Sequence, residues 1–262
     1  MTITHALFLG FLQGITELLP ISSSGHLALA EHFFAFSFDP LTLQGFDVTL
    51  HAGTLLALLL CYDARWRVII LSVFTAERSG RVLLFSIVIA TIPAAVSGFF
   101  LERIIAETLR GPFILGLSFI ATAVILLLTE SIGSRSPARP LTPVRAFVIG
   151  CAQALALVPA LSRSGLTAGT GRMMGLSRIE AVDFSFLMAV PAIVGALLLT
   201  INGAFRGEIA LPGLPILVSG FLSAFVVSMV AVVFLRRFVR TRSLAWFSCY
   251  LIPVGIAAML WR

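Results

Sequence analysis

A short polar segment near the start of an otherwise apolar chain combines groups that phosphate chemistry uses. Between Glu17 and His26 it places a carboxylate, three neighbouring serine hydroxyls and an imidazole within ten positions. Small serine and glycine residues let backbone N–H groups approach an oxyanion, and a helix starting after the turn would direct its positive end toward it. The serines alone fit an ordinary helix cap better. A carboxylate in apolar surroundings is costly unless it is paired, protonated or bound to a cation, and His26 can move a proton near neutral pH, so the two together favour a functional site.

A second polar segment, Pro159 to Gly165, supplies a positive charge. Arg163 lies between Ser162 and Ser164, and a planar guanidinium flanked by hydroxyls and backbone N–H groups suits bidentate binding of a phosphate. An arginine whose head reaches the membrane interface is the alternative interpretation. Together the two segments predict binding and hydrolysis of a phosphate ester.

Asp47 and His51 are four residues apart and therefore share one face of a helix. We expect them to lie beside the first polar segment and to orient it, with Asp183 as the counterpart in the second half of the chain. Hydrogen bonds that only hold helices together explain these residues equally well.

The composition requires a membrane. Of the 262 residues, 59% are hydrophobic and 11% are charged, whereas a soluble domain carries about 25% charged residues. The net charge of +6 does not indicate nucleic acid, because the arginines are scattered between apolar runs instead of being gathered with exposed aromatic residues. We therefore expect an all-α integral membrane protein that contacts membrane lipids and no nucleic acid.

Apolar runs long enough to cross a hydrocarbon core of about 30 Å occur at 43–62, 82–101, 112–130, 183–202, 213–235 and 244–261. Two further apolar regions, 1–36 and 143–177, are broken by Pro, Ser and Gly and contain the two polar segments. Broken backbone at membrane depth persists only where protein buries it or where it lines a wet cavity. These regions are predicted to be re-entrant helical hairpins, with Pro20 and Pro159 near their turns.

The two hairpin regions repeat each other at a constant offset of 140 residues. The positions are Gly10, Gln13, Ser22, Ser24 and Gly25, matched by Gly150, Gln153, Ser162, Ser164 and Gly165. They predict a single membrane domain, 1–262, built from repeats of about 1–135 and 141–262. Because each repeat holds a hairpin and three crossings, the second repeat must enter from the opposite side, a plan that places a site near the midplane.

The arginines predict the orientation of the chain. Loops 63–81, 131–145 and 236–243 are rich in arginine and fall on one side of the six crossings, which the positive-inside rule makes cytoplasmic. Both termini are then predicted to be periplasmic, with the first hairpin entering from the outside and the site opening toward the periplasm.

These motifs resemble a known family. Gln13–Glu17 and Leu19–His26 resemble the first signature of the bacterial undecaprenyl pyrophosphate phosphatases of the bacitracin-resistance type, and Pro159–Gly165 resembles their second. The resemblance extends over essentially the whole chain. It implies hydrolysis of undecaprenyl diphosphate to undecaprenyl phosphate in the bacterial inner membrane, a role in recycling the lipid carrier for the cell wall, and dependence on a divalent cation, Mg²⁺ or Ca²⁺.

The residue types in the two segments suggest a hypothesis for the role of each. We expect Glu17, helped by Gln13, to hold the cation, and Ser23 to be the nucleophile with His26 as its base. Direct attack by water that His26 activates is the alternative. The catalytic set is thus Glu17, Ser23, His26 and Arg163. The expected phosphate-binding set is Ser22, Ser24, Gly25, Ser162, Arg163, Ser164 and Gly165.

Two positions depart from the family pattern. Gln13 stands where the first signature often has Glu, which puts a site with two carboxylates in doubt, although an amide oxygen can still bind a hard cation. Ala160 replaces the usual Gly of the second signature, which is tolerable if its φ is negative. The rival function is transport of undecaprenyl phosphate or another anionic lipid, as the inverted repeat suggests. The sequence leaves open whether the protein is a homodimer.

Overall fold

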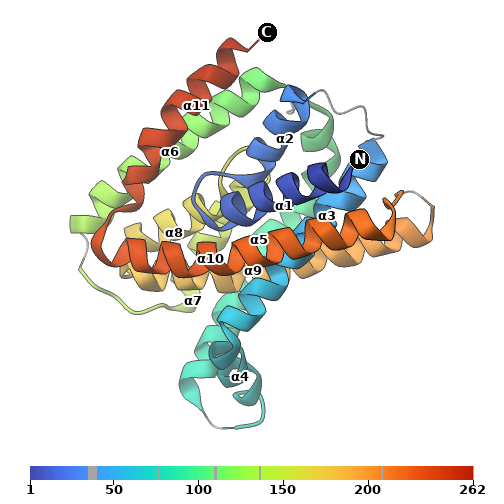
Figure 1. Cartoon of the computed structure of the whole chain (residues 1–262). Helices are drawn as coiled ribbons and strands as arrows, with labels where there is room; N and C mark the ends of the chain where they lie inside the picture. Colours follow the sequence, from blue (N-terminus) through green and yellow to red (C-terminus); the bar gives the residue numbers. More distant parts are fainter. Residues whose placement is uncertain (35–39, 76, 109–110, 136, 208, 262) are drawn as a thin grey trace.

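The computed structural model describes the chain except residues 35–39, 76, 109–110, 136, 208 and 262, and all its described elements are helical. In chain order they are α1 (Ile3–Leu18), α2 (Ser23–Phe33), α3 (Pro40–Cys61), α4 (Asp63–Leu71), α5 (Arg78–Thr108), α6 (Pro112–Arg135), α7 (Pro143–Leu155), α8 (Arg163–Met173), α9 (Arg178–Phe205), α10 (Leu214–Thr241), the 3₁₀ turn η1 (Leu244–Phe247) and α11 (Ser248–Leu260). Figure 1 shows their arrangement, with α4 projecting from one end of the bundle. The expectation of an all-helical protein is confirmed.

Five of the six expected crossings are long apolar helices. They are Thr42–Cys61 in α3, Arg78–Phe100 in α5, Pro112–Gly133 in α6, Arg178–Phe205 in α9 and Leu214–Thr241 in α10. Their length and composition agree with an integral membrane protein.

The prediction differs from the structure in two places. The sixth expected crossing, 244–261, is shorter, because η1 uses its first residues as a 3₁₀ turn and leaves the 13 residues of α11 as the regular helix. The expected loop 63–81 contains α4, which Ile69 anchors in the hydrophobic core while its other positions are mostly exposed.

Both broken regions form helical hairpins at the predicted places. α1 and α2 are joined at residues 19–22, and α7 and α8 at residues 156–162. Each second helix begins with the same cap: the hydroxyl of Ser22 accepts the N–H of Gly25, and that of Ser162 accepts the N–H of Gly165. The capping interpretation, made for the serines of the first segment, is thus confirmed at Ser22, and Ser162 makes the same cap.

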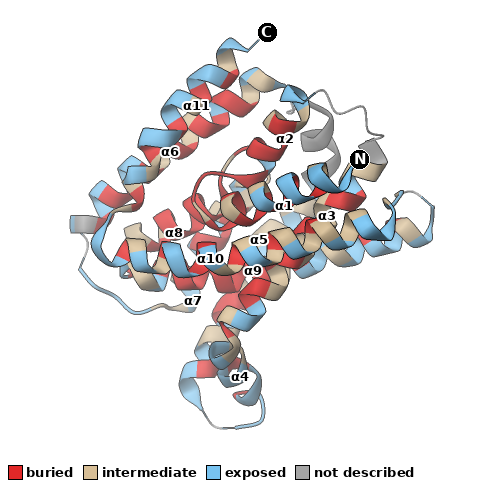
Figure 2. Cartoon of the chain, in the orientation of Figure 1, coloured by how far each residue is buried: buried red, intermediate tan, exposed pale blue. Residues whose placement is uncertain are grey.

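Each hairpin packs on a helix from the other half of the chain. α1 lies along α10, and α7 lies along α5. Glycine permits the close approach: a Cβ at Gly10 would lie 2.5 Å from the carbonyl oxygen of Gly220, and one at Gly150 would lie 2.4 Å from that of Ala90. Burial is concentrated in α8 and in the first half of α9, and Figure 2 shows the buried residues toward the middle of the bundle.

Candidate active site

The tips of the two hairpins touch. The backbone N–H of Ala160 donates to the hydroxyl of Ser24 over 3.3 Å, and the hydroxyl of Ser164 donates to the carbonyl of Leu19 over 2.9 Å. The start of α2 therefore contacts the turn before α8, and the start of α8 contacts the turn before α2. Helix starts that meet in this way concentrate backbone N–H groups around one point, which suits an anion.

A buried ion pair joins the two tips. Nη2 of Arg163 lies 2.7 Å from Oε1 of Glu17, and the two side chains are 16% and 8% exposed. Nη1 of Arg163 points to the carbonyl of Ser185 on α9, at 3.5 Å. A guanidinium held by two partners on different helices has a fixed orientation, and removing one member of such a buried pair costs about 3–5 kcal/mol.

The second oxygen of Glu17 is surrounded by three groups. Ser23 donates its hydroxyl to Oε2, Gln13 approaches the same atom with its amide nitrogen at 3.4 Å, and Nε2 of His51 lies 3.5 Å away. Nδ1 of His51 contacts the backbone carbonyl of Asp47 over 2.8 Å, so that Nδ1 carries a proton. The structure thus places His51 against the first hairpin, where it was expected, and brings Ser23 to the carboxylate.

His26 takes a different position from the one that a base for Ser23 requires. Its Nδ1 lies 2.6 Å from the carbonyl of Ser22, and its Nε2 lies 2.8 Å from the hydroxyl of Tyr250 on α11. The imidazole also stacks on the Tyr250 ring and meets Phe119 edge-on. Among the described residues, the hydrogen-bond acceptor of the Ser23 hydroxyl is Glu17. A catalytic role for His26 stays a prediction.

Sequence reasoning did not include Tyr250 and Ser185 in the site. Tyr250 carried a signal, because a tyrosine within an apolar helix usually finds a partner for its hydroxyl. Ser185 carried none, since it contributes a backbone carbonyl and, through its side chain, a 2.6 Å contact with the hydroxyl of Thr167. Thr167 in turn donates to the carbonyl of Arg163, so that α9 supports the start of α8.

Ala160 does not meet the condition under which alanine was expected to fit. Its φ is +63°, in the left-handed region that favours glycine, and its side chain is buried. The turn of the second hairpin therefore keeps the conformation that glycine would adopt without strain.

The side-chain oxygens at this site are enough to bind a divalent cation only if the substrate supplies further oxygen ligands. Oε1 of Gln13 is buried and has no hydrogen-bond partner among the residues that the structure describes, and the Glu17 carboxylate lies beside the same side chain. In the described part of the chain, no group of three or more His, Cys, Asp and Glu side chains could hold a metal. Mg²⁺ is commonly bound by one or two protein oxygens together with phosphate oxygens, and Gln13 with Glu17 fits that arrangement.

Comparison with known proteins gives a consistent result. The family model described as "Bacitracin resistance protein BacA" matches residues 6–257. An undecaprenyl-diphosphatase of Pelotomaculum thermopropionicum is 35% identical over 265 residues, covering 99% of this chain and 97% of the relative. Relatives with the same name from Gemmatimonas aurantiaca and Trichlorobacter lovleyi are 37% and 40% identical, covering 98% and 99% of this chain and 96% and 97% of the relatives. With the whole chain matched in this way, the protein belongs to the BacA family of bacitracin resistance proteins.

Proposed function

We propose that the protein hydrolyses undecaprenyl diphosphate to undecaprenyl phosphate and inorganic phosphate. The observation that carries the proposal is the buried pair of Glu17 and Arg163, which joins two polar hairpin tips inside an apolar bundle. The family and its named relatives act as the independent support. The reaction returns the lipid carrier to cell-wall synthesis and removes the diphosphate that bacitracin sequesters.

Arg163 binds the terminal phosphate. Its guanidinium already has a fixed direction between Glu17 and Ser185, and the start of α8 adds backbone N–H groups. As the phosphoryl group transfers, negative charge on its equatorial oxygens is stabilised by donors that need no reorganisation. Ser22, Ser24, Gly25, Ser162, Ser164 and Gly165 form and hold the two turns around this point.

Ser23 attacks the terminal phosphorus, and the bond between that phosphorus and the bridging oxygen breaks. Undecaprenyl phosphate leaves with the bonding electrons, and the Ser23 hydroxyl, which Glu17 orients as a hydrogen-bond acceptor, gives its proton to water. Water then hydrolyses the phosphoserine and releases inorganic phosphate. In the alternative route water that His26 activates attacks the phosphorus directly, and no phosphoserine forms.

A divalent cation, Mg²⁺ or Ca²⁺, completes the site. Glu17 and the unpartnered oxygen of Gln13 would hold it, and it would neutralise charge on the diphosphate. The buried and unpartnered oxygen of Gln13 supports this assignment.

The architecture proposed for this activity is the inverted repeat of 1–135 and 141–262. The packing of the two hairpins supports it. α1 packs on α10, and α7 packs on α5, so that the hairpin of each half contacts a helix of the other half. In this arrangement the termini and the opening of the site face the periplasm. The same symmetry favours a second activity, transfer of undecaprenyl phosphate across the bilayer.

The test is phosphate release from undecaprenyl diphosphate by the purified protein in detergent. We expect turnover with Mg²⁺ or Ca²⁺ and none after chelation. Because detergent removes the two sides of the membrane, a protein that only transports lipid would release no phosphate, and that result would contradict the proposal.

A further inference from the structure

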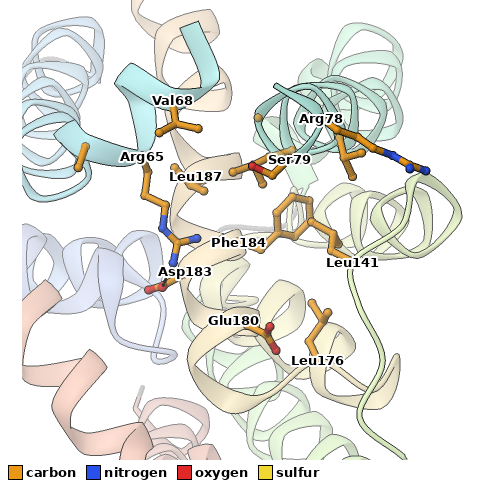
Figure 3. A pocket seen from close by; sticks show the side chains of 14 residues that line it. Arg65, Val68, Arg78, Ser79, Leu141, Leu176, Glu180, Asp183, Phe184 and Leu187 are labelled. Atoms are coloured by element: carbon orange, nitrogen blue, oxygen red, sulfur yellow. Dashed lines mark hydrogen bonds and ion pairs between the residues drawn. The ribbon is translucent and has the colours of Figure 1, made fainter. Parts of the chain in front are cut away.

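A cavity of about 790 Å³ lies away from the catalytic residues, between α4, the start of α5 and α9 (Figure 3). Val68, Leu83, Phe184 and Leu187 contribute apolar wall, while Arg65 lies at its polar end. The volume falls in the range of about 300–1,000 Å³ that is typical of ligand pockets. Neither Glu17 nor any other member of the expected catalytic set lines it.

The floor of the cavity is a saturated carboxylate. Asp183 is 1% exposed. Its Oδ1 accepts from the Tyr62 hydroxyl at 2.5 Å and from Nε of Arg236 at 2.9 Å, and its Oδ2 accepts from Arg65 and Arg236, both at 3.3 Å. A carboxylate has about four lone-pair positions, so Asp183 has no capacity for further donors.

Arg65 has donors to spare. It directs Nη2 to Asp183, which leaves its Nε and Nη1 without a partner among the described residues, and its side chain is 52% exposed. Figure 3 shows its guanidinium between Asp183 and the apolar wall. Glu180, which also lines the cavity, accepts the backbone N–H of Ser177 at the start of α9 with one of its carboxylate oxygens. Arg65 still has hydrogen-bond donors available to an anionic ligand.

The apolar wall determines what kind of anion fits. Val68 on α4 and Val82 on α5 are exposed on either side of the cavity and give it apolar surface. Arg67 and Arg81 follow in the same arginine-rich segment, and such segments are attracted to anionic membrane surfaces. A water-soluble anion would leave this wall without a partner, whereas an amphiphile would cover it.

We propose that this cavity binds an anionic membrane phospholipid. Arg65 holds the phosphodiester, and one acyl chain lies along Val68, Leu83 and Leu187. This site is separate from the catalytic site and does not depend on hydrolysis.

The test uses the full chain purified in detergent, incubated with phosphatidylglycerol or phosphatidylcholine and examined by native mass spectrometry. We expect the protein to retain phosphatidylglycerol in preference to phosphatidylcholine. Arg65→Gln should lower the retained phosphatidylglycerol by about tenfold, the effect of one charge-assisted hydrogen bond. Its matched control is Arg67→Gln, because Arg67 lies on the same helix, is 71% exposed and pairs with Asp63 outside the cavity.

A second variant guards against misfolding. Val68→Trp fills the apolar entrance and should also reduce retention, whereas Val73→Trp, at an exposed position outside the cavity, should not. Arg163→Lys, which keeps the charge opposite Glu17, should bind phosphatidylglycerol normally, which separates this site from the catalytic one. The proposal is overturned if Arg65→Gln and Val68→Trp retain the lipid like the wild type, if both lipids bind equally, or if inorganic phosphate alone displaces phosphatidylglycerol.

Discussion

Replacing Arg163 by lysine separates the charge of this side chain from its shape. The guanidinium contacts Oε1 of Glu17 at 2.7 Å and the carbonyl of Ser185 at 3.5 Å with two different nitrogens. A single ammonium keeps the charge opposite Glu17 but cannot hold both partners and present a planar fork to a phosphate. Arg163→Lys should therefore fold, whereas Arg163→Ala leaves a buried carboxylate unpaired, at a cost of about 3–5 kcal/mol in unfolding free energy.

The expected loss of activity follows from the number of contacts. Losing one charge-assisted hydrogen bond in the transition state raises the activation free energy by about 1.5–3 kcal/mol. An increase of about 1.36 kcal/mol slows the reaction tenfold. Arg163→Lys should therefore lower kcat roughly 10- to 150-fold for phosphate release from undecaprenyl diphosphate at saturating cation. Thermal unfolding in the same detergent measures the fold separately.

Arg172→Lys is the matched control for this substitution. Arg172 lies on the same helix, is 13% exposed, and donates to the carbonyls of Gly133 and Leu176 outside the site. A general loss of helix support would affect both variants, but only the change at Arg163 should reduce kcat. A rate for Arg163→Lys within about threefold of wild type, or an equal loss for Arg172→Lys, would refute the phosphate-binding assignment.

Three further predictions concern the hairpin tips. Ser23→Ala should lower kcat by about 100-fold or more, and rapid acid quenching of the wild type should trap phosphoserine; substantial activity without phosphoserine would favour direct attack by water. Gln13→Glu should reduce the cation concentration needed for half-maximal activity, because a second carboxylate strengthens a hard-cation site, and an unchanged requirement would remove Gln13 from it. Gly25→Ala should lower stability by about 1–3 kcal/mol, since a Cβ there would lie 2.5 Å from Phe119; Gly98→Ala, with open space around it, is the control in the same melting experiment.

The helical architecture was largely predictable from hydrophobic length. Five crossings and both hairpins lie at the expected residues, because apolar runs and Pro-containing breaks are local properties of the chain. The short α11 and the added α4 were missed. In both places tertiary contacts decide the structure: Leu244 is buried within η1, and Ile69 anchors α4 in the core.

The site was predictable in its residue types but only partly in its pairings. Polar residues in apolar surroundings identified Glu17 and Arg163, since such residues are costly without a partner. The sequence offered His26 as the partner of Ser23 because the two are three positions apart, whereas the fold turns the imidazole toward Tyr250, 224 positions away. A contact of that range depends on how α2 packs against α11, which local sequence does not encode.

The opposite charges of the catalytic pair are encoded on either side of the proline-rich link that contains Pro137 and Pro140. The two halves of the chain therefore depend on each other, because Glu17 without Arg163, or Arg163 without Glu17, would be an unpaired charge in apolar surroundings. Cutting the gene at that link would produce two fragments that are each inert, and any activity they regained together would measure how well the portions recognise each other. Because one chain carries both residues, every molecule contains one Glu17 for each Arg163.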